Sequence, residues 1–186
     1  MAKLARKAIP EQPALFAPGQ PPRSWTDWLG YYQQKSGGGY FPLSPGKAKH
    51  LAAADAVLQN RFNLNNQLYQ LPPNFNWQHN PSTDLEWLIL LHKFYYLKDL
   101  ACAYDFTGDE NYAKKWVELI ETWINQVPEG FIDSQVTGRR LQQWLLSYRY
   151  FVGKFHAPSI TPDFFARFMQ SVNAQTHYLC SHLTPE

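Results

Sequence analysis

The stretch TDLEWLILLHKFYYLKDLACAYDFTGDENYA, residues 83–113, decides the fold. Residues 84–106 form a long apolar run at helical spacing, and TGDE then ends it with a glycine that suits a left-handed turn. Yet Glu86, His92 and Lys98 interrupt the run on different faces. Because a helix that is apolar all round is buried all round, such polar groups must be paired or must open onto a cavity.

Further helices are predicted on both sides of this stretch. Downstream, apolar residues recur at helical spacing between loops that contain Gly or Pro. Trp116 and Trp123 lie on the inward stripe of the next helix and are expected in the core. Residues 61–83 are expected to be irregular, because Asn and Pro compete with regular backbone hydrogen bonding. The other predicted helices cover residues 24–32, 44–60, 109–126, 136–152 and 161–182.

These elements predict an all-α protein of antiparallel helical hairpins, since no segment shows the sustained alternation of a sheet. Residues 44–186 are expected to form one helical unit. Residues 1–43 are rich in Pro and Gly, so we expect a partly disordered N-terminal arm that contains one short helix.

The composition excludes several classes of protein. Charged residues make up 17% of the 186-residue chain, against a usual value of about 25%. The net charge of +2 is too small to indicate nucleic-acid binding. Aromatic residues reach 16%, with seven Trp. That content suits a helix-packed core, which is the default interpretation, or a groove that stacks sugars.

The sequence predicts no membrane contact and no cofactor. No apolar run approaches the ~20 residues that span a bilayer. Residues 8–30 are Pro-rich and polar, unlike a signal peptide, so the chain as written looks cytoplasmic. Cys102 and Cys180 have no metal-binding or redox spacing and are expected to be buried free thiols. No phosphate loop, metal cluster or Ser/His/Asp arrangement is found.

Three motifs in order resemble a known family. They are Leu-His-x-Phe-x-x-Leu from Leu91, Thr-Gly-Asp from Thr107 and Arg-Leu-x-x-Trp from Arg140. This set is similar to the N-terminal helical domain of heparinase II/III-like polysaccharide lyases, and the resemblance covers about residues 50–186. It implies an incomplete α/α toroid followed by a β-sandwich domain.

The resemblance also implies β-elimination on uronic-acid polysaccharides, often in the periplasm. In such a reaction a base removes the proton alpha to a carboxylate, donors neutralise the developing charge, and the 4-linked sugar leaves. The family assigns this work to an Asn-His pair and a Tyr later in the toroid, and to a His of the sheet domain. This chain has no Asn-His dipeptide and ends at SHLTPE. We therefore expect an N-terminal part of a larger lyase-like protein, inactive alone.

Six residues are candidates for contact with an acidic polysaccharide. Arg140 is the strongest, because a permanent cation on an apolar helix suits a polyanion; the alternative is stacking on Trp144 or pairing with Glu86. His92 could bind substrate or assist proton transfer, but a hydrogen-bonded core histidine is the favoured interpretation. The full set of candidates is Arg140, Trp144, His92, Glu86, Trp77 and His79.

Glu86 could touch sugar hydroxyls, although a structural ion pair is the favoured interpretation. Trp77 and His79 could form a sugar-stacking platform at the mouth of a cleft. Alternatively, they could plug the end of the toroid.

Two other functions stay open. Stacked helical hairpins often bind protein partners without catalysis. A helical-toroid glycoside hydrolase would need two acidic residues across one cleft, and the sequence nominates no such pair. An unfinished toroid would also leave apolar faces uncovered, so self-association is expected.

Overall fold

The computed structural model describes residues 24–35 and 47–182 and confirms an all-α fold. The expectations for the N-terminal arm outside Trp25–Lys35, and for residues 183–186, lie outside the described residues. The elements are α1 (Trp25–Lys35), α2 (Lys47–Leu58), β1 (Arg61–Leu64), β2 (Gln67–Gln70), α3 (Leu85–Lys93), α4 (Leu97–Thr107), α5 (Glu110–Gln126), α6 (Ser134–Tyr148), the π-helical η1 (Arg149–Lys154) and α7 (Pro162–His182).

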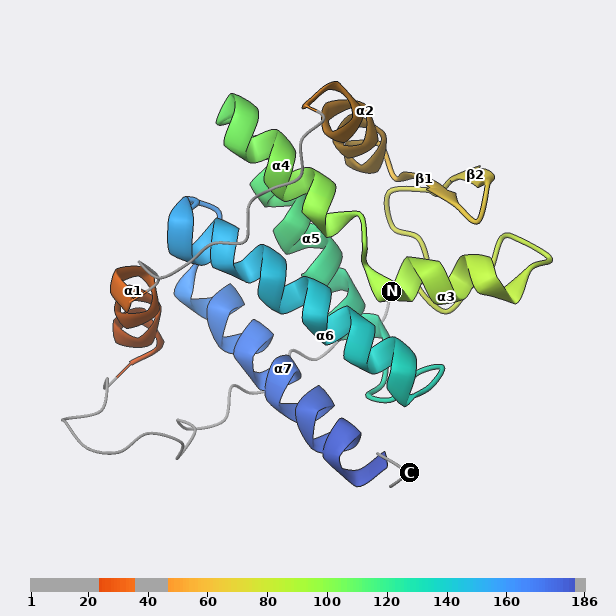
Figure 1. Ribbon diagram of the computed structural model, residues 1–186. Coiled ribbons are helices and arrows are strands. Elements are labelled where there is room, and N and C mark those ends of the chain that lie inside the picture. The colour runs from red at the N-terminus through yellow and green to blue at the C-terminus, as the bar shows by residue number, and fades with distance from the viewer. Residues whose placement is uncertain (1–23, 36–46, 183–186) are drawn as a thin grey trace.

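Two helical hairpins, α4–α5 and α6–α7, form the body of the molecule. Figure 1 shows α6 and α7 side by side and running in opposite directions, with α5 behind them. α2 packs on α4, and α1 packs on η1 and α7. α3 packs on α6 and carries the β1–β2 hairpin at the far end from α1. This arrangement agrees with the predicted hairpins.

The prediction of one helix over residues 84–106 is wrong, because the chain breaks at Phe94. Phe94 has a φ of 59°, in the left-handed region, and α3 ends there. A non-glycine residue in this region costs about 1–2 kcal/mol. The ring of Phe94 is fully buried between Trp77 and Trp144, at centroid distances of 5.2 and 5.7 Å. Its burial offsets the backbone cost, and a periodic apolar pattern does not reveal such a break.

The break explains why the polar groups of residues 83–113 point to different faces. On α3, Lys93 Nζ lies 3.4 Å from Glu86 Oε1 at the surface. On α4, Asp99 Oδ1 lies 2.6 Å from His50 Nδ1 of α2. α3 and α4 are therefore separate helices whose polar groups reach separate partners.

Residues 61–70 form a β-hairpin, which corrects the expectation of irregular structure there. β1 and β2 are antiparallel, and Leu64 pairs with Gln67 across a two-residue turn. Asn65 and Asn66 have φ values of 48° and 59°. Positive φ at both turn positions defines a type I′ turn, which Asn tolerates. The Trp87 indole donates to the Gln67 carbonyl at 3.0 Å and so docks the hairpin on α3.

Polar side chains cap the starts of two helices. The Asp109 carboxylate accepts from the backbone N–H of Asn111 at 2.9 Å and caps α5. Thr161 accepts from the N–H of Phe164 at 3.1 Å, with Pro162 as the first residue of α7. The helix predicted for residues 136–152 instead ends at Tyr148 and continues as η1. The wider π-helical turn contains four consecutive buried residues, 150–153.

Two glycines should respond in opposite ways to alanine. Gly108 has a φ of 69°, so Gly108→Ala is expected to lower the free energy of unfolding by about 1 kcal/mol. Gly138 lies inside α6 with nothing within 4 Å of an added Cβ. Gly138→Ala is therefore expected to raise the free energy of unfolding by about 0.5–1 kcal/mol. Urea denaturation checks both; a change of the same sign in the two variants would contradict this account.

The core is aromatic, which confirms the default interpretation of the Trp content. Trp116 and Trp123 of α5 are at most 1% exposed, as expected. Cys102 is buried as expected, whereas the expectation is wrong for Cys180, which is exposed near the end of α7; neither forms a disulfide within the described residues. Among the described residues, no helix is long and apolar enough to cross a bilayer.

Candidate functional site

His92 lies at the centre of a buried polar network. Its Nδ1 accepts from the indole Nε1–H of Trp123 at 3.0 Å, because an indole nitrogen can only donate. The proton must therefore sit on Nε2, which donates to the carbonyl of Trp77 at 2.8 Å. Burial lowers the pKa of His92 to about 4, an effect that the Trp77 carbonyl opposes and nearby Arg140 reinforces. Both nitrogens of a neutral ring are occupied, which is the arrangement of a structural histidine.

Arg140 of α6 is buried beside this network. Its Nε donates to Gln175 Oε1 at 2.6 Å and its Nη2 to Thr137 Oγ1 at 3.0 Å. The guanidinium carbon lies 4.1 Å from the centroid of the Trp123 ring, a cation–π contact. Its partners are thus neutral, and neither Trp144 nor Glu86 is among them. Burial lowers the pKa of Arg140 to about 9, and its Nη1 has no hydrogen-bond partner.

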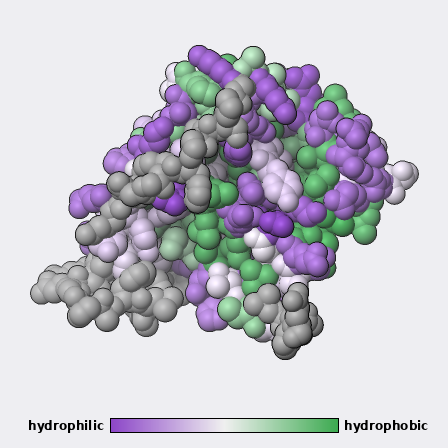
Figure 2. Space-filling model, in the orientation of Figure 1, coloured by the Kyte–Doolittle hydropathy of each residue, from purple (hydrophilic) through white to green (hydrophobic). Residues whose placement is uncertain are grey.

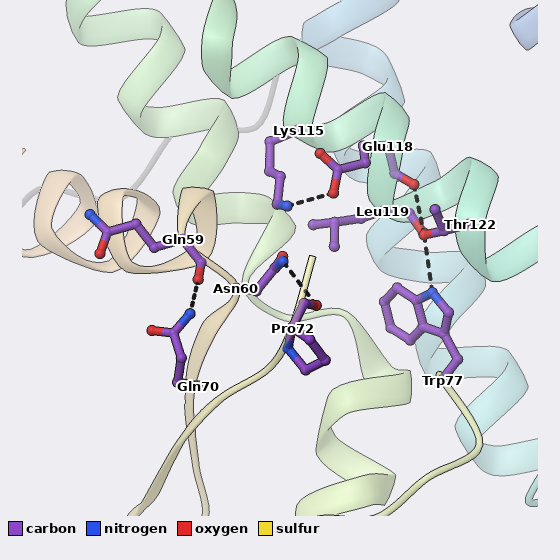
Figure 3. A network of polar contacts seen from close by, with 9 residues as sticks. All are labelled: Gln59, Asn60, Gln70, Pro72, Trp77, Lys115, Glu118, Leu119 and Thr122. Atoms are coloured by element: carbon purple, nitrogen blue, oxygen red, sulfur yellow. Dashed lines mark hydrogen bonds and ion pairs between the residues drawn. The ribbon is translucent and has the colours of Figure 1, made fainter. Parts of the chain in front are cut away.

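Trp77 and Trp144 are also core residues, each with 0% exposure. The Trp77 indole donates to Thr122 Oγ1 of α5 at 3.0 Å, as Figure 3 shows. Trp144 packs edge-on against Trp123 at 5.4 Å and stacks on Phe168 at 5.7 Å. Trp77 thus has no exposed ring surface in this structure.

The lead-in segment before α3 is held against α5 at several points. Figure 3 shows Trp77 and Thr122 joined beside the ion pair of Lys115 and Glu118, whose atoms are 2.7 Å apart. The backbone N–H of Trp77 also donates to Gln126 Oε1 at 3.2 Å, and the Gln78 side chain donates to the Gln126 carbonyl at 2.8 Å. Within the segment, the Asn60 side chain donates to the carbonyl of Pro72 at 3.4 Å. The contacts with α5 fix the irregular segment on the helical body and bury Trp77.

Two predicted residues do reach the surface. Glu86 pairs with Lys93, and its side chain is 43% exposed. His79 is exposed in a turn of the lead-in segment. The structure therefore brings His92, Trp77 and Arg140 together, and leaves Glu86 and His79 apart from them. Because the four buried candidates have no exposed surface, a saccharide would reach them only if the core opened; their packing supports a structural role.

The structure also shows surfaces that the sequence interpretation passed over. A shallow hollow of about 470 Å³ lies on the outer face of α5, between Lys114, Glu118, Glu121 and Ser159. The outward face of α6 includes exposed Arg139 and Gln142. The sequence feature that could have pointed to this face is that α6 contains no Asp or Glu. Within the described ranges, no group of three or more His, Cys, Asp or Glu could hold a metal ion.

Comparison with known proteins gives a consistent result. The family model of the heparinase II/III N-terminus matches residues 16–186. A heparin-sulfate lyase of Pedobacter heparinus is 30% identical over 117 residues, which are 59% of this chain and 17% of that protein. A heparin-sulfate lyase of Bacteroides thetaiotaomicron is 24% identical over 155 residues, or 73% of this chain and 22% of that protein.

A solved structure agrees with these sequence relatives. The crystal structure of a heparan sulfate lyase mutant from Pedobacter heparinus has a TM-score of 0.78 and 25% identity, and covers 87% of this chain and 28% of that chain. The chain thus spans less than a quarter of the length of the two curated relatives, at 17% and 22%. The fold is that of the helical toroid segment in these structures.

Proposed function

The chain belongs to the heparinase II/III N-terminal family, and we propose on that premise that it forms the first helices of a polysaccharide lyase. The substrate class is a uronic-acid polysaccharide, and the reaction is β-elimination. The match over residues 16–186 carries the proposal, supported by the two relatives that are named heparin-sulfate lyases. No particular observation favours a protein-binding module or a glycoside hydrolase.

In this proposal the chain contributes scaffold and part of the substrate cleft. The buried network of His92, Trp123 and Arg140 locks α3, α5 and α6 together, so that their outer faces keep a fixed relation. Preorganised donors are what the reaction demands, because the proton alpha to the carboxylate is only weakly acidic. The Asn-His pair that the family uses does not occur in this sequence. We therefore assign no residue of this chain to proton abstraction, and self-association is a separate prediction.

The test is a pair of measurements on this chain. Titration calorimetry with heparan sulfate is expected to show binding, and a neutral dextran of similar length is expected to show none. Ultraviolet absorbance is expected to detect no unsaturated uronate product. Equal binding of dextran would contradict the acidic substrate class, and product formation would contradict the inactivity of the chain alone.

A further inference from the structure

The outward face of α6 carries no acidic residue. Its exposed residues follow the helical repeat on the side opposite the buried Arg140. They include one cation and two amides, and none of the 15 residues of α6 is acidic. The exposed residues of this face are Gln135, Arg139, Gln142 and Leu145.

The side chain of Gln142 holds Arg139 in place. Its Nη1 donates to Gln142 Oε1, one turn along, at 3.2 Å. Among the described residues, Arg139 has no carboxylate at ion-pair distance, whereas Lys93 and Lys154 do. Because the Gln142 amide is neutral, it orients the Arg139 guanidinium without neutralising its positive charge. A guanidinium can receive a carboxylate through two parallel N–H donors.

The hollow on α5 is the opposite case. Lys114 shares it with Glu118 and Glu121, and Lys115 is already paired with Glu118 at 2.7 Å. Glu121 is likewise paired, with Arg167. Of the two surfaces, only the face of α6 presents, among the described residues, a cation with no carboxylate beside it.

The α6 face also carries apolar surface, because Leu145 is 43% exposed on it. Figure 2 shows hydrophobic and hydrophilic residues side by side on the side of the molecule that it displays. Mixed polar and apolar surface is suited to sugar, which presents hydroxyls at its edges and C–H groups on its faces.

We propose that the outward face of α6 is a saccharide subsite in which Arg139, oriented by Gln142, binds the carboxylate of a uronate unit. The proposal rests on the proposed function and deepens it by assigning the residues that recognise the acid. Gln135 offers a further amide one turn before Arg139. Binding here needs no opening of the core.

The test compares variants that remove equal charge from different surfaces. Arg139→Ala is expected to weaken binding of heparan sulfate to this chain about fivefold by titration calorimetry, the size of an exposed ion pair. Arg139→Lys keeps the positive charge but loses the two parallel N–H donors of the guanidinium. Its affinity should fall between those of the parent and Arg139→Ala. Lys114→Ala, which removes a cation from the α5 surface, should leave the affinity unchanged. Thermal unfolding of each variant should match the parent, since both side chains are exposed.

Three outcomes would overturn the subsite. If the parent chain binds heparan sulfate and Arg139→Ala binds equally well, the subsite is elsewhere although the proposed function stands. If carboxyl-reduced heparan sulfate binds as tightly as the native polymer, with the same loss in Arg139→Ala, the recognised group is not a carboxylate. If the parent binds no acidic polysaccharide, the subsite and the proposed function fail together.

Discussion

Replacing Trp123 by alanine is expected to lower the free energy of unfolding by about 5 kcal/mol. Truncation of a buried Trp commonly costs about 3–5 kcal/mol through lost contacts and the cavity left behind. Here the indole also donates to His92 and lies under the Arg140 guanidinium. Its removal leaves a buried acceptor unpaired, which adds about 1–3 kcal/mol.

Urea denaturation followed by Trp fluorescence measures this loss. Trp123→Phe keeps a benzene ring but loses the pyrrole ring with its N–H donor, so its cost should fall between that of Trp123→Ala and that of an exposed substitution. Lys114→Ala on the exposed side of the same helix is the matched control and should stay within about 0.5 kcal/mol of the parent. A loss in Trp123→Ala no larger than in this control would show that α5 does not depend on the buried network.

Acidification is expected to remove about 3 kcal/mol of stability through His92 alone. The pKa of His92 is lowered from 6.5 to about 4 by burial in the folded state. Below pH 6.5 His92 is protonated in the unfolded chain but stays neutral in the folded chain. Lowering the pH therefore stabilises the unfolded state relative to the folded state. The contribution of the neutral ring is complete above pH 6.5 and is lost as the pH falls to about 4.

Denaturation curves at a series of pH values isolate this contribution. His92→Gln keeps one donor for Trp77 and one acceptor for Trp123 but does not titrate. The stability difference between parent and His92→Gln should be constant above pH 6.5 and shrink by about 3 kcal/mol towards pH 4. His79→Gln changes an exposed histidine and should follow the parent throughout. A difference that does not vary with pH would mean that the pKa of His92 is the same in the folded and unfolded states.

The fold was predictable where local signals decide it. The Thr-Gly-Asp turn acts within one helical turn and lies where the sequence placed it, between α4 and α5. The last helix likewise begins next to residue 161, as predicted. The break at Phe94 was not predictable, because its backbone cost is offset by packing against Trp77 and Trp144, far away in sequence. The β-hairpin was missed because its strands have only four residues each.

The candidate residues were predictable in kind but not in position. The rule that polar groups on a buried helix must be paired or must face a cavity holds, since His92 is paired at both nitrogens. The partners of Arg140 could not be inferred, because Gln175 lies 35 residues away on α7. The bond between Arg139 and Gln142 and the exposure of both side chains are visible only in the packed structure.

The left-handed residue between α3 and α4 carries a consequence for how this sequence can vary. Phe94 serves two demands that usually fall on different residues, a turn that favours glycine and a core position that favours an aromatic ring. Glycine would relax the backbone and empty the centre; any other large side chain would keep the backbone cost. No single substitution at position 94 satisfies both demands. The strained backbone of Phe94 is therefore needed for the close packing of the core around it.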